Sequence, residues 1–119
     1  MLDEATVNRI KDTMRSVCRS PNVHCYKIGF TSAPSFKRAN SHRNKWGYTS
    51  FIILADCLTR DEALHLEEAL FREATSDRKS ILWKRHEPET REGPYRRSYG
   101  GTPADKANLN SHCVYMIWQ

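Results

Sequence analysis

The chain has 119 residues, carries a formal net charge of +5 and has a pI of about 9.2. A chain of this length forms one domain around a single modest core, so we take residues 1–119 as one domain. No stretch approaches the roughly 18 apolar residues of a membrane span, and the charged first residues do not resemble a secretory signal. We therefore expect an intracellular protein, cytoplasmic or associated with the nucleoid or nucleus, without a membrane partner.

The first part of the chain is predicted to form a helix, a strand and a second helix. Apolar residues recur at helical spacing over residues 3–17, and a Ser-Pro-Asn break follows. Residues 23–30 have the composition of a strand, and residues 34–43 begin with a proline that suits the first position of a short helix. Because side chains alternate along a strand, its faces carry Tyr26, Ile28 and Phe30 on one side and Cys25 and Lys27 on the other.

A second strand and a longer helix follow. Residues 48–58 are predicted to form a strand whose central apolar run, residues 51–54, is buried on both faces. Thr59 and Glu62 form a capping box, in which each side chain accepts a hydrogen bond from a backbone N–H of the other residue. The helix that starts there is expected to run for about four turns, to Thr75.

The rest of the chain is polar and irregular until its last residues. Residues 81–83 are the only clear apolar patch within 76–111, and residues 103–107 are expected to form one helical turn. Residues 113–118 are predicted to form a third apolar strand. Three strands and at least three helices predict an α+β fold, with helices packed on a small, mostly antiparallel three-stranded sheet.

The segment Tyr26-Lys27-Ile28-Gly29, followed by Arg38 and His42, is the first candidate for a functional site. One helical turn separates Arg38 from His42, so both side chains project from one helix face. A guanidinium, an imidazole and a phenol that converge at a sheet edge suit a phosphodiester substrate. Taken singly, each residue has a plainer explanation, because strand tyrosines usually pack and exposed helix side chains are usually solvated.

Glu67 is the second candidate, because it falls inside the apolar stripe of the helix that follows Thr59. That stripe consists of Ala63, Leu66, Leu70, Phe71 and Ala74. A carboxylate on the core side of a helix is costly unless it is paired or binds a cation. Glu67 could therefore bind a metal, pair with Arg38 or Lys27, or lie at a rim where the helix leaves the sheet.

Together these residues resemble the GIY-YIG nuclease superfamily. In that family a tyrosine–any–glycine strand is followed by an arginine, often with a histidine four residues later, and a later helix carries a metal-binding glutamate. The resemblance covers residues 23–75 in sequence order. It is carried by Tyr26, Ile28, Gly29, Arg38, His42 and Leu66-Glu67-Glu68-Ala69-Leu70, with Lys27 as an extra residue between the tyrosine and the isoleucine.

The family's first strand, which reads Gly-Ile-Tyr, has no match before Tyr26. The C-terminal segment Cys113-Val114-Tyr115-Met116-Ile117 resembles it, with cysteine in place of glycine. We therefore hypothesise that the chain is circularly permuted, so that the C-terminal strand pairs with residues 23–30. Chain termini often lie close together, which makes such a rearrangement physically easy.

The resemblance implies a small endonuclease that hydrolyses phosphodiester bonds with Mg²⁺ or Mn²⁺, acting on DNA rather than RNA. Tyr115, or Tyr26 with Lys27 nearby, would help to activate a water molecule or hold the scissile phosphate. The alternative is a GIY-YIG-like module without turnover, which binds nucleic acid or another protein.

The other implied site residues would act on the charge of the phosphate. Arg38 would meet the charge that builds on the phosphate, because its planar fork matches two oxygens. His42 would relay a proton or hold a phosphate oxygen. Glu67 would bind the divalent ion, since one carboxylate, phosphate oxygens and waters make a typical magnesium shell.

The polar segment after residue 76 mixes aromatic and cationic side chains, which suits backbone phosphates and stacking bases. Its candidate nucleic-acid-binding residues are Lys84, Arg85, Tyr95, Arg96, Arg97 and Tyr99. A solvated surface loop is the plain alternative. Because the sequence has no separate DNA-targeting domain, specificity would lie in this segment and a possible homodimer, or would be low.

The four cysteines leave two questions open. They could form two disulfides in a secreted chain, whereas a cytosolic chain would keep them as reduced thiols, which we favour. A zinc site is also conceivable, although the spacing of its ligands matches no common zinc finger. Such a site would be assembled from Cys18, His24, Cys25, His112 and Cys113.

Overall fold

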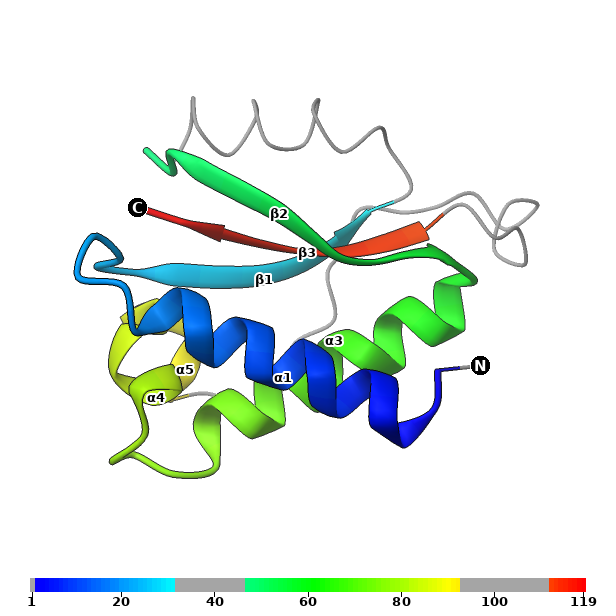
Figure 1. Ribbon diagram of the computed structural model, residues 1–119, viewed down its shortest axis with the longest axis horizontal. Coiled ribbons are helices and arrows are strands. Elements are labelled where there is room, and N and C mark those ends of the chain that lie inside the picture. The colour runs from blue at the N-terminus through cyan, green and yellow to red at the C-terminus, as the bar shows by residue number, and fades with distance from the viewer. Residues whose placement is uncertain (1, 32–46, 93–111) are drawn as a thin grey trace.

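The computed structural model describes residues 2–31, 47–92 and 112–119 and has an α+β fold. Helices pack against a three-stranded antiparallel sheet (Figure 1), as the sequence predicts. The elements in chain order are α1 (Glu4–Cys18), β1 (Tyr26–Thr31), β2 (Ser50–Leu58), α3 (Arg60–Thr75), α4 (Ile81–Arg85), α5 (Pro88–Arg91) and β3 (His112–Trp118). The helices predicted at 34–43 and 103–107 lie outside the described residues.

The C-terminal strand lies in the middle of the sheet, whose order is β1-β3-β2. β3 pairs antiparallel with β1, from Tyr26 opposite Trp118 to Thr31 opposite Cys113. The pairing continues past the strand ends, because the N–H of His24 donates to the carbonyl of Gln119 at 2.7 Å. The predicted pairing of the last strand with residues 23–30 is therefore confirmed.

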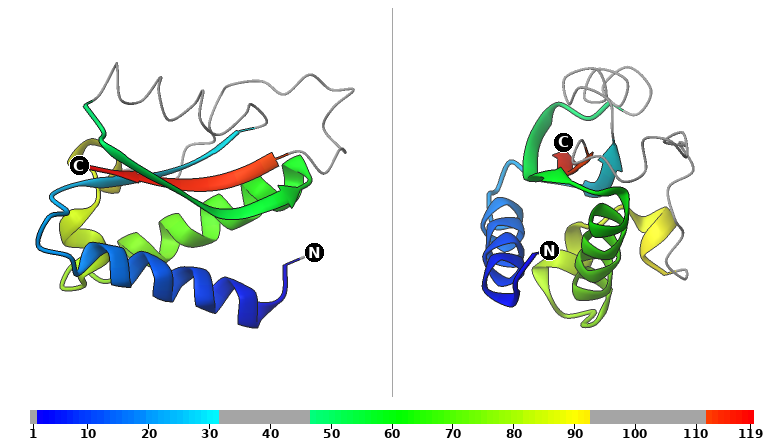
Figure 2. Two further views of the ribbon diagram at one scale, coloured as in Figure 1. Left: turned by 45° about the horizontal axis from the view of Figure 1, so that its top comes forward. Right: turned by 90° about the vertical axis from the view of Figure 1, so that its right-hand side faces the viewer.

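The two long helices, α1 and α3, lie beneath the same face of the sheet (Figure 2), which we call the inner face. Its side chains from β1 and β3 are Tyr26, Ile28, Phe30, Val114, Met116 and Trp118. Met14 of α1 and Leu70 of α3 are fully buried against them. Truncating a leucine in such a position to alanine typically costs about 2–5 kcal/mol.

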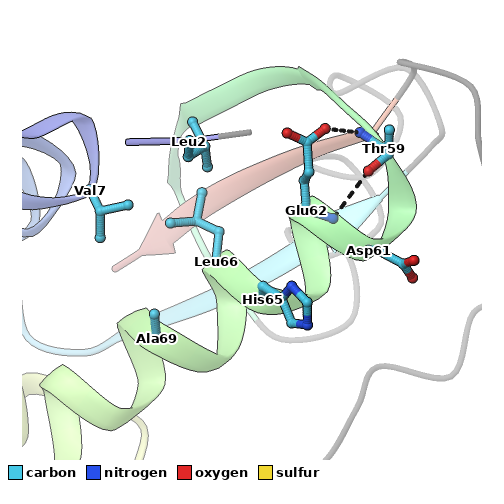
Figure 3. Close-up of a pocket in the computed structure, with 8 residues that line it drawn as sticks. All are labelled: Leu2, Val7, Thr59, Asp61, Glu62, His65, Leu66 and Ala69. Atoms are coloured by element: carbon cyan, nitrogen blue, oxygen red, sulfur yellow. Dashed lines mark hydrogen bonds between the residues drawn. The ribbon is translucent and has the colours of Figure 1, made fainter. Parts of the chain in front are cut away.

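Both long helices begin at a capping residue. The side chain of Asp3 accepts a hydrogen bond from the N–H of Thr6 at 2.7 Å, which satisfies a free donor of α1. The predicted capping box is present at α3 (Figure 3), where Thr59 and Glu62 exchange hydrogen bonds of 3.0 and 3.2 Å. The backbone N–H of Thr59 also holds the pKa of Glu62 down, to about 2.

The prediction that residues 51–54 are buried on both faces is wrong. Ile53 is 42% exposed, and the other three residues of the run are only half-buried. The reason is the position of β2 at an edge of the sheet, where only one neighbour covers it. The strand also bulges between Ile53 and Leu58, with Cys57 at a φ of 57°, and such irregularities blunt an exposed edge.

The segment after α3 is more regular than its polar composition suggests. Ser80 caps α4 by accepting a hydrogen bond from the N–H of Trp83, and α5 follows within a few residues. The segment attaches to the outer edge of β1, because the N–H of Glu87 donates to the carbonyl of Tyr26 at 3.0 Å. Leu82 is buried in the main core, which explains why this short piece holds its shape.

Within the described residues, no helix is both long enough and apolar enough to cross a membrane.

Candidate active site

Tyr115 lies on the face of the sheet opposite to α1 and α3, which we call the outer face. Its position on β3 is directly across from Gly29 on β1. A Cβ atom on Gly29 would meet the phenol oxygen of Tyr115 and would lie 2.6 Å from its Cζ. Residue 29 must therefore lack a side chain, because the Tyr115 ring leans from the central strand across β1, toward the edge of the sheet.

An aromatic cluster holds Tyr115 in this orientation. Its ring stacks on that of Phe51 with 5.3 Å between centroids and 26° between planes. Tyr48 and Ile117 complete the cluster, and Tyr115 itself is buried. A phenol that is fixed on all sides by packing is preorganised, which is what a positioning or proton-transfer role requires.

Lys27 projects from the same outer face as Tyr115. Lys27 pairs with Ile117, which is two residues from Tyr115 along β3. Along β1, Lys27 is two residues from Gly29. Alternate residues of a strand share a face and are spaced by roughly 7 Å. The residue that interrupts the family pattern in the sequence is thus the one that shares the face of Tyr115.

Tyr26 lies on the inner face and has a structural environment. It has no exposed surface, and its hydroxyl donates a hydrogen bond to the carbonyl of Leu82 at 2.8 Å. Burial raises the pKa of Tyr26 far above its usual value, so the phenolate is not accessible near neutral pH. Tyr26 joins β1 to α4, and we do not include it in the candidate site.

Glu67 is 4% exposed on the core side of α3, as its place in the apolar stripe predicts. Residues four apart share a helix flank, so Glu67 lies on the same flank as Phe71. The ring centroids of Phe71 and His86 are 5.7 Å apart, and those of His86 and Tyr26 are 5.1 Å apart. The flank of α3 that carries Glu67 therefore faces the side of the core where β1 forms the edge.

The sheet separates the predicted site residues into two groups. Lys27 and Tyr115 lie on the outer face, whereas Glu67 and Tyr26 lie beneath the inner face. Because β1 forms an edge of the sheet, Tyr115 on β3 lies one strand away from that edge. The predicted Arg38 and His42 lie outside the described residues, as do Tyr95, Arg96, Arg97 and Tyr99.

The two predicted nucleic-acid-binding residues within α4 differ in their surroundings. Lys84 is exposed, as a phosphate contact requires. Arg85 is half-buried, and its Nε atom is enclosed without a hydrogen-bond partner. Its charge acts on the buried thiol of Cys18, whose pKa burial nevertheless raises to about 12. Arg85 therefore packs against the body of the domain, and Lys84 is the better candidate contact.

The carboxylate of Glu67 has the oxygen donors that Mg²⁺ and Mn²⁺ accept. In residues 2–31, 47–92 and 112–119, no three His, Cys, Asp or Glu side chains gather closely enough to hold a metal ion. A magnesium ion held by one carboxylate, phosphate oxygens and waters needs no such cluster. The four cysteines, all of which lie in the described ranges, form no disulfide bond.

Two further cations lie beside α4 that sequence reasoning did not select. Arg78 and Arg91 both place their guanidinium groups on the ring of Trp83, at 4.8 and 5.1 Å from its centroid. Neither residue lies on the same helix as Trp83, since Arg78 precedes α4 and Arg91 ends α5. Only the tryptophan within an otherwise polar segment could have signalled a stacking site.

A groove of about 530 Å³ opens between the start of α1 and the start of α3, on the helical side of the domain (Figure 3). Leu2, Val7 and Leu66 contribute apolar lining, and the acidic residues Asp61 and Glu62 also line it. Carboxylates in the lining repel phosphates, so the groove is unsuited to a nucleic-acid backbone.

The chain was compared with protein-family models, with curated proteins and with solved structures, and none of these comparisons found a match.

Proposed function

We propose that the protein is a small, metal-dependent endonuclease of the GIY-YIG type, circularly permuted, that hydrolyses phosphodiester bonds in DNA. The observation that carries the proposal is the phenol of Tyr115 lying across Gly29 toward the edge of the sheet. The pairing of β3 with β1, which the hypothesis of a circular permutation requires, also supports the proposal.

In this proposal the substrate lies along the edge formed by β1. Lys27 supplies a positive charge from the outer face, next to the position of Tyr115. Tyr115 holds or activates the attacking water through its hydroxyl. Because its ring is fixed by Phe51 and Tyr48, little reorganisation is needed when the substrate binds.

The remaining chemistry is assigned to side chains that act on charge. Arg38 stabilises the negative charge on the phosphate through two N–H groups, and His42, four residues later, moves a proton or holds an oxygen. Glu67 holds the divalent ion, which would stabilise the leaving oxygen when bound. Glu67 is buried beneath the inner face, on the flank of α3 that it shares with Phe71.

Plasmid nicking in the presence of Mg²⁺ tests this proposal. Arg38→Ala and Glu67→Gln are each expected to lower the nicking rate by on the order of 100-fold or more, since each removes charge stabilisation of the transition state. Glu68→Gln is the matched control, because Glu68 is the adjacent residue but pairs with Arg72 at 2.7 Å on the outside of α3. Equal nicking by the wild type and all three variants would contradict the proposal and indicate a contaminating nuclease.

A second candidate function is nucleic-acid binding without turnover. The burial of Tyr115 in an aromatic cluster favours it, because packing alone is sufficient reason for such a cluster. A shifted band in a gel-shift assay, together with an intact plasmid in Mg²⁺ and in Mn²⁺, would support this second function over the first.

A further inference from the structure

The ring of Trp83 lies between two guanidinium groups at the end of the domain that α4 and α5 form. Arg78 and Arg91 lie 4.8 and 5.1 Å from the ring centroid, within the range of a cation–π interaction. Trp83 itself is 8% exposed, so its ring is a fixed support rather than a mobile side chain. Two cations are thus held in place before any ligand arrives.

The contacts of these arginines leave them able to bind an anion. Arg91 donates one hydrogen bond from its Nη1 to the carbonyl of Trp83 at 3.2 Å and its Nε is enclosed, so its other Nη N–H groups are the donors left for a phosphate. The side chain of Arg78 is 75% exposed, and its ion pair with Glu92 spans 4.0 Å between two exposed groups. Such a pair contributes little, so a phosphate can replace Glu92 as the partner of Arg78.

The positive charge continues from α5 to the outer face of the sheet. His86 lies at the outer edge of β1, where it bridges to Tyr26. Lys27 follows Tyr26, the bridge partner of His86, along β1, and after burial as the main cause the charges of Arg91 and Lys27 both lower the pKa of His86. Lys27 is two residues from Gly29 on the same face, which is where Tyr115 crosses the strand.

We propose that Arg78, Arg91 and Lys27 form a track for backbone phosphates that leads a DNA duplex from the α4–α5 end to the edge of β1. This inference rests on the proposed function, because it takes nucleic acid as the ligand. It adds to that function a set of contacts to phosphates on either side of the one that reacts. The contacts are to phosphates alone, so binding along the track is independent of base sequence.

The salt dependence of binding reports the number of phosphate contacts, because each contact that is removed reduces the slope of log K against log salt. Affinity for a fluorescent 20-bp duplex is measured by anisotropy in EDTA, without a divalent ion, between about 50 and 200 mM KCl, a range suited to counterion release. Arg78→Gln and Arg91→Gln are each expected to reduce the slope of log K against log salt by about one. The wild-type advantage in affinity over each variant then shrinks roughly 3.5-fold across that range.

Arg72→Gln is the matched control for Arg78→Gln. The side chains of Arg72 and Arg78 are 74% and 75% exposed, and each forms an ion pair with one glutamate. Arg72 pairs with Glu68 on α3 and is not part of the proposed track, so its replacement is expected to leave the slope unchanged. Equal slopes for Arg72→Gln and Arg78→Gln, or a wild type that does not bind the duplex at 50 mM salt, would overturn the inference.

The outcome can be separated from that of the proposed nuclease activity. If the wild type binds the duplex and both arginine variants show the predicted reduction in slope, but the wild type never nicks a plasmid, the track is supported and the endonuclease is contradicted. If the wild type nicks the plasmid but Arg78→Gln has the same slope of log K against log salt as the wild type, the endonuclease is supported and the track is contradicted.

Discussion

Tyr26 and Tyr115 lie on neighbouring strands, and the sheet points them in opposite directions. Tyr26 enters the inner core, where its hydroxyl is bound to the carbonyl of Leu82. Tyr115 lies on the outer face, where its ring crosses a glycine toward the edge of the sheet. Two tyrosines on neighbouring strands therefore have different surroundings, because alternate faces of the sheet are covered by different parts of the chain, and the proposed function assigns a role in the reaction to Tyr115 alone.

The same contrast separates the two faces of the sheet as a whole. The inner face is covered by α1 and α3, which are also joined by the pairing of Lys11 and Arg15 with Glu73. The outer face holds a smaller cluster around Tyr115, with Lys27 on the same side. We therefore assign stability mainly to the inner face, and under the proposed function the reaction takes place at the outer face and the β1 edge.

Gly29→Val is expected to have the largest effect, because a side chain at this position would occupy the space of the Tyr115 phenol. Overpacking of this kind typically costs about 1–3 kcal/mol of stability, and the displaced phenol should abolish nicking. Urea unfolding and the nicking assay measure both effects. Ile28→Val, one residue away on the inner face, is the control. Retained nicking in Gly29→Val would show that the position of Tyr115 is irrelevant.

Tyr26→Phe is expected to lower the free energy of unfolding by about 1 kcal/mol, because the carbonyl of Leu82 loses one of its two donors and keeps only the N–H of His86. The nicking rate of the folded variant should not change. Urea unfolding followed by circular dichroism measures the first effect. An unchanged midpoint would indicate that the hydrogen bond to Leu82 contributes nothing to the inner face.

Thr59→Ala is expected to destabilise the protein by about 1 kcal/mol, since it removes the N-cap of the helix that carries Glu67. Ser80→Ala removes the N-cap of α4, which has five residues, and should cost less. Thermal unfolding of the two variants side by side tests the ranking. If Ser80→Ala loses more stability than Thr59→Ala, the α4 segment contributes more to stability than the assignment of stability mainly to the inner face predicts.

The smallest effect expected is a pH dependence from His86. Burial between the rings of Tyr26 and Phe71 lowers its pKa, with Arg91 and Lys27 adding to the effect. The unfolded chain then binds a proton more readily, so stability falls as pH drops below the ordinary histidine value of about 6.5 and levels off below the folded pKa.

His86→Gln should flatten this part of the stability profile, whereas substitution of the exposed His65 should not. Urea unfolding at a series of pH values between about 5 and 8, which brackets the ordinary histidine pKa, provides the measurement. If stability depends no more steeply on pH in the wild type than in His86→Gln, the buried, neutral state of His86 is contradicted.

Local patterns in the sequence predicted much of the fold. Helical periodicity predicted α1, the Thr59–Glu62 pair predicted the start of α3, and the apolar C-terminal segment predicted the strand that pairs with β1. Alternation also placed Tyr26 and Lys27 on opposite faces of β1. It could not indicate which face the helices would cover, because that depends on contacts between distant segments.

The errors have the same origin. The exposure of Ile53 follows from the edge position of β2, which no local pattern encodes. The arginine pair around Trp83 depends on the turn between α3, α4 and α5, so its three members carry no common period. Lys27 was already a candidate site residue from the sequence, and the strand register adds that it lies opposite Ile117, on the face that carries Tyr115.

A comparison of Tyr115→Phe with Tyr26→Phe in one DNA-cleavage assay tests the central claim most directly. Both variants lose a single hydroxyl, and both are assayed with Mg²⁺ at a temperature where circular dichroism shows them folded. The account predicts that Tyr115→Phe cleaves on the order of 100-fold more slowly than the wild type, while Tyr26→Phe cleaves at the wild-type rate. Equal rates for the two variants, or a loss confined to Tyr26→Phe, would contradict it.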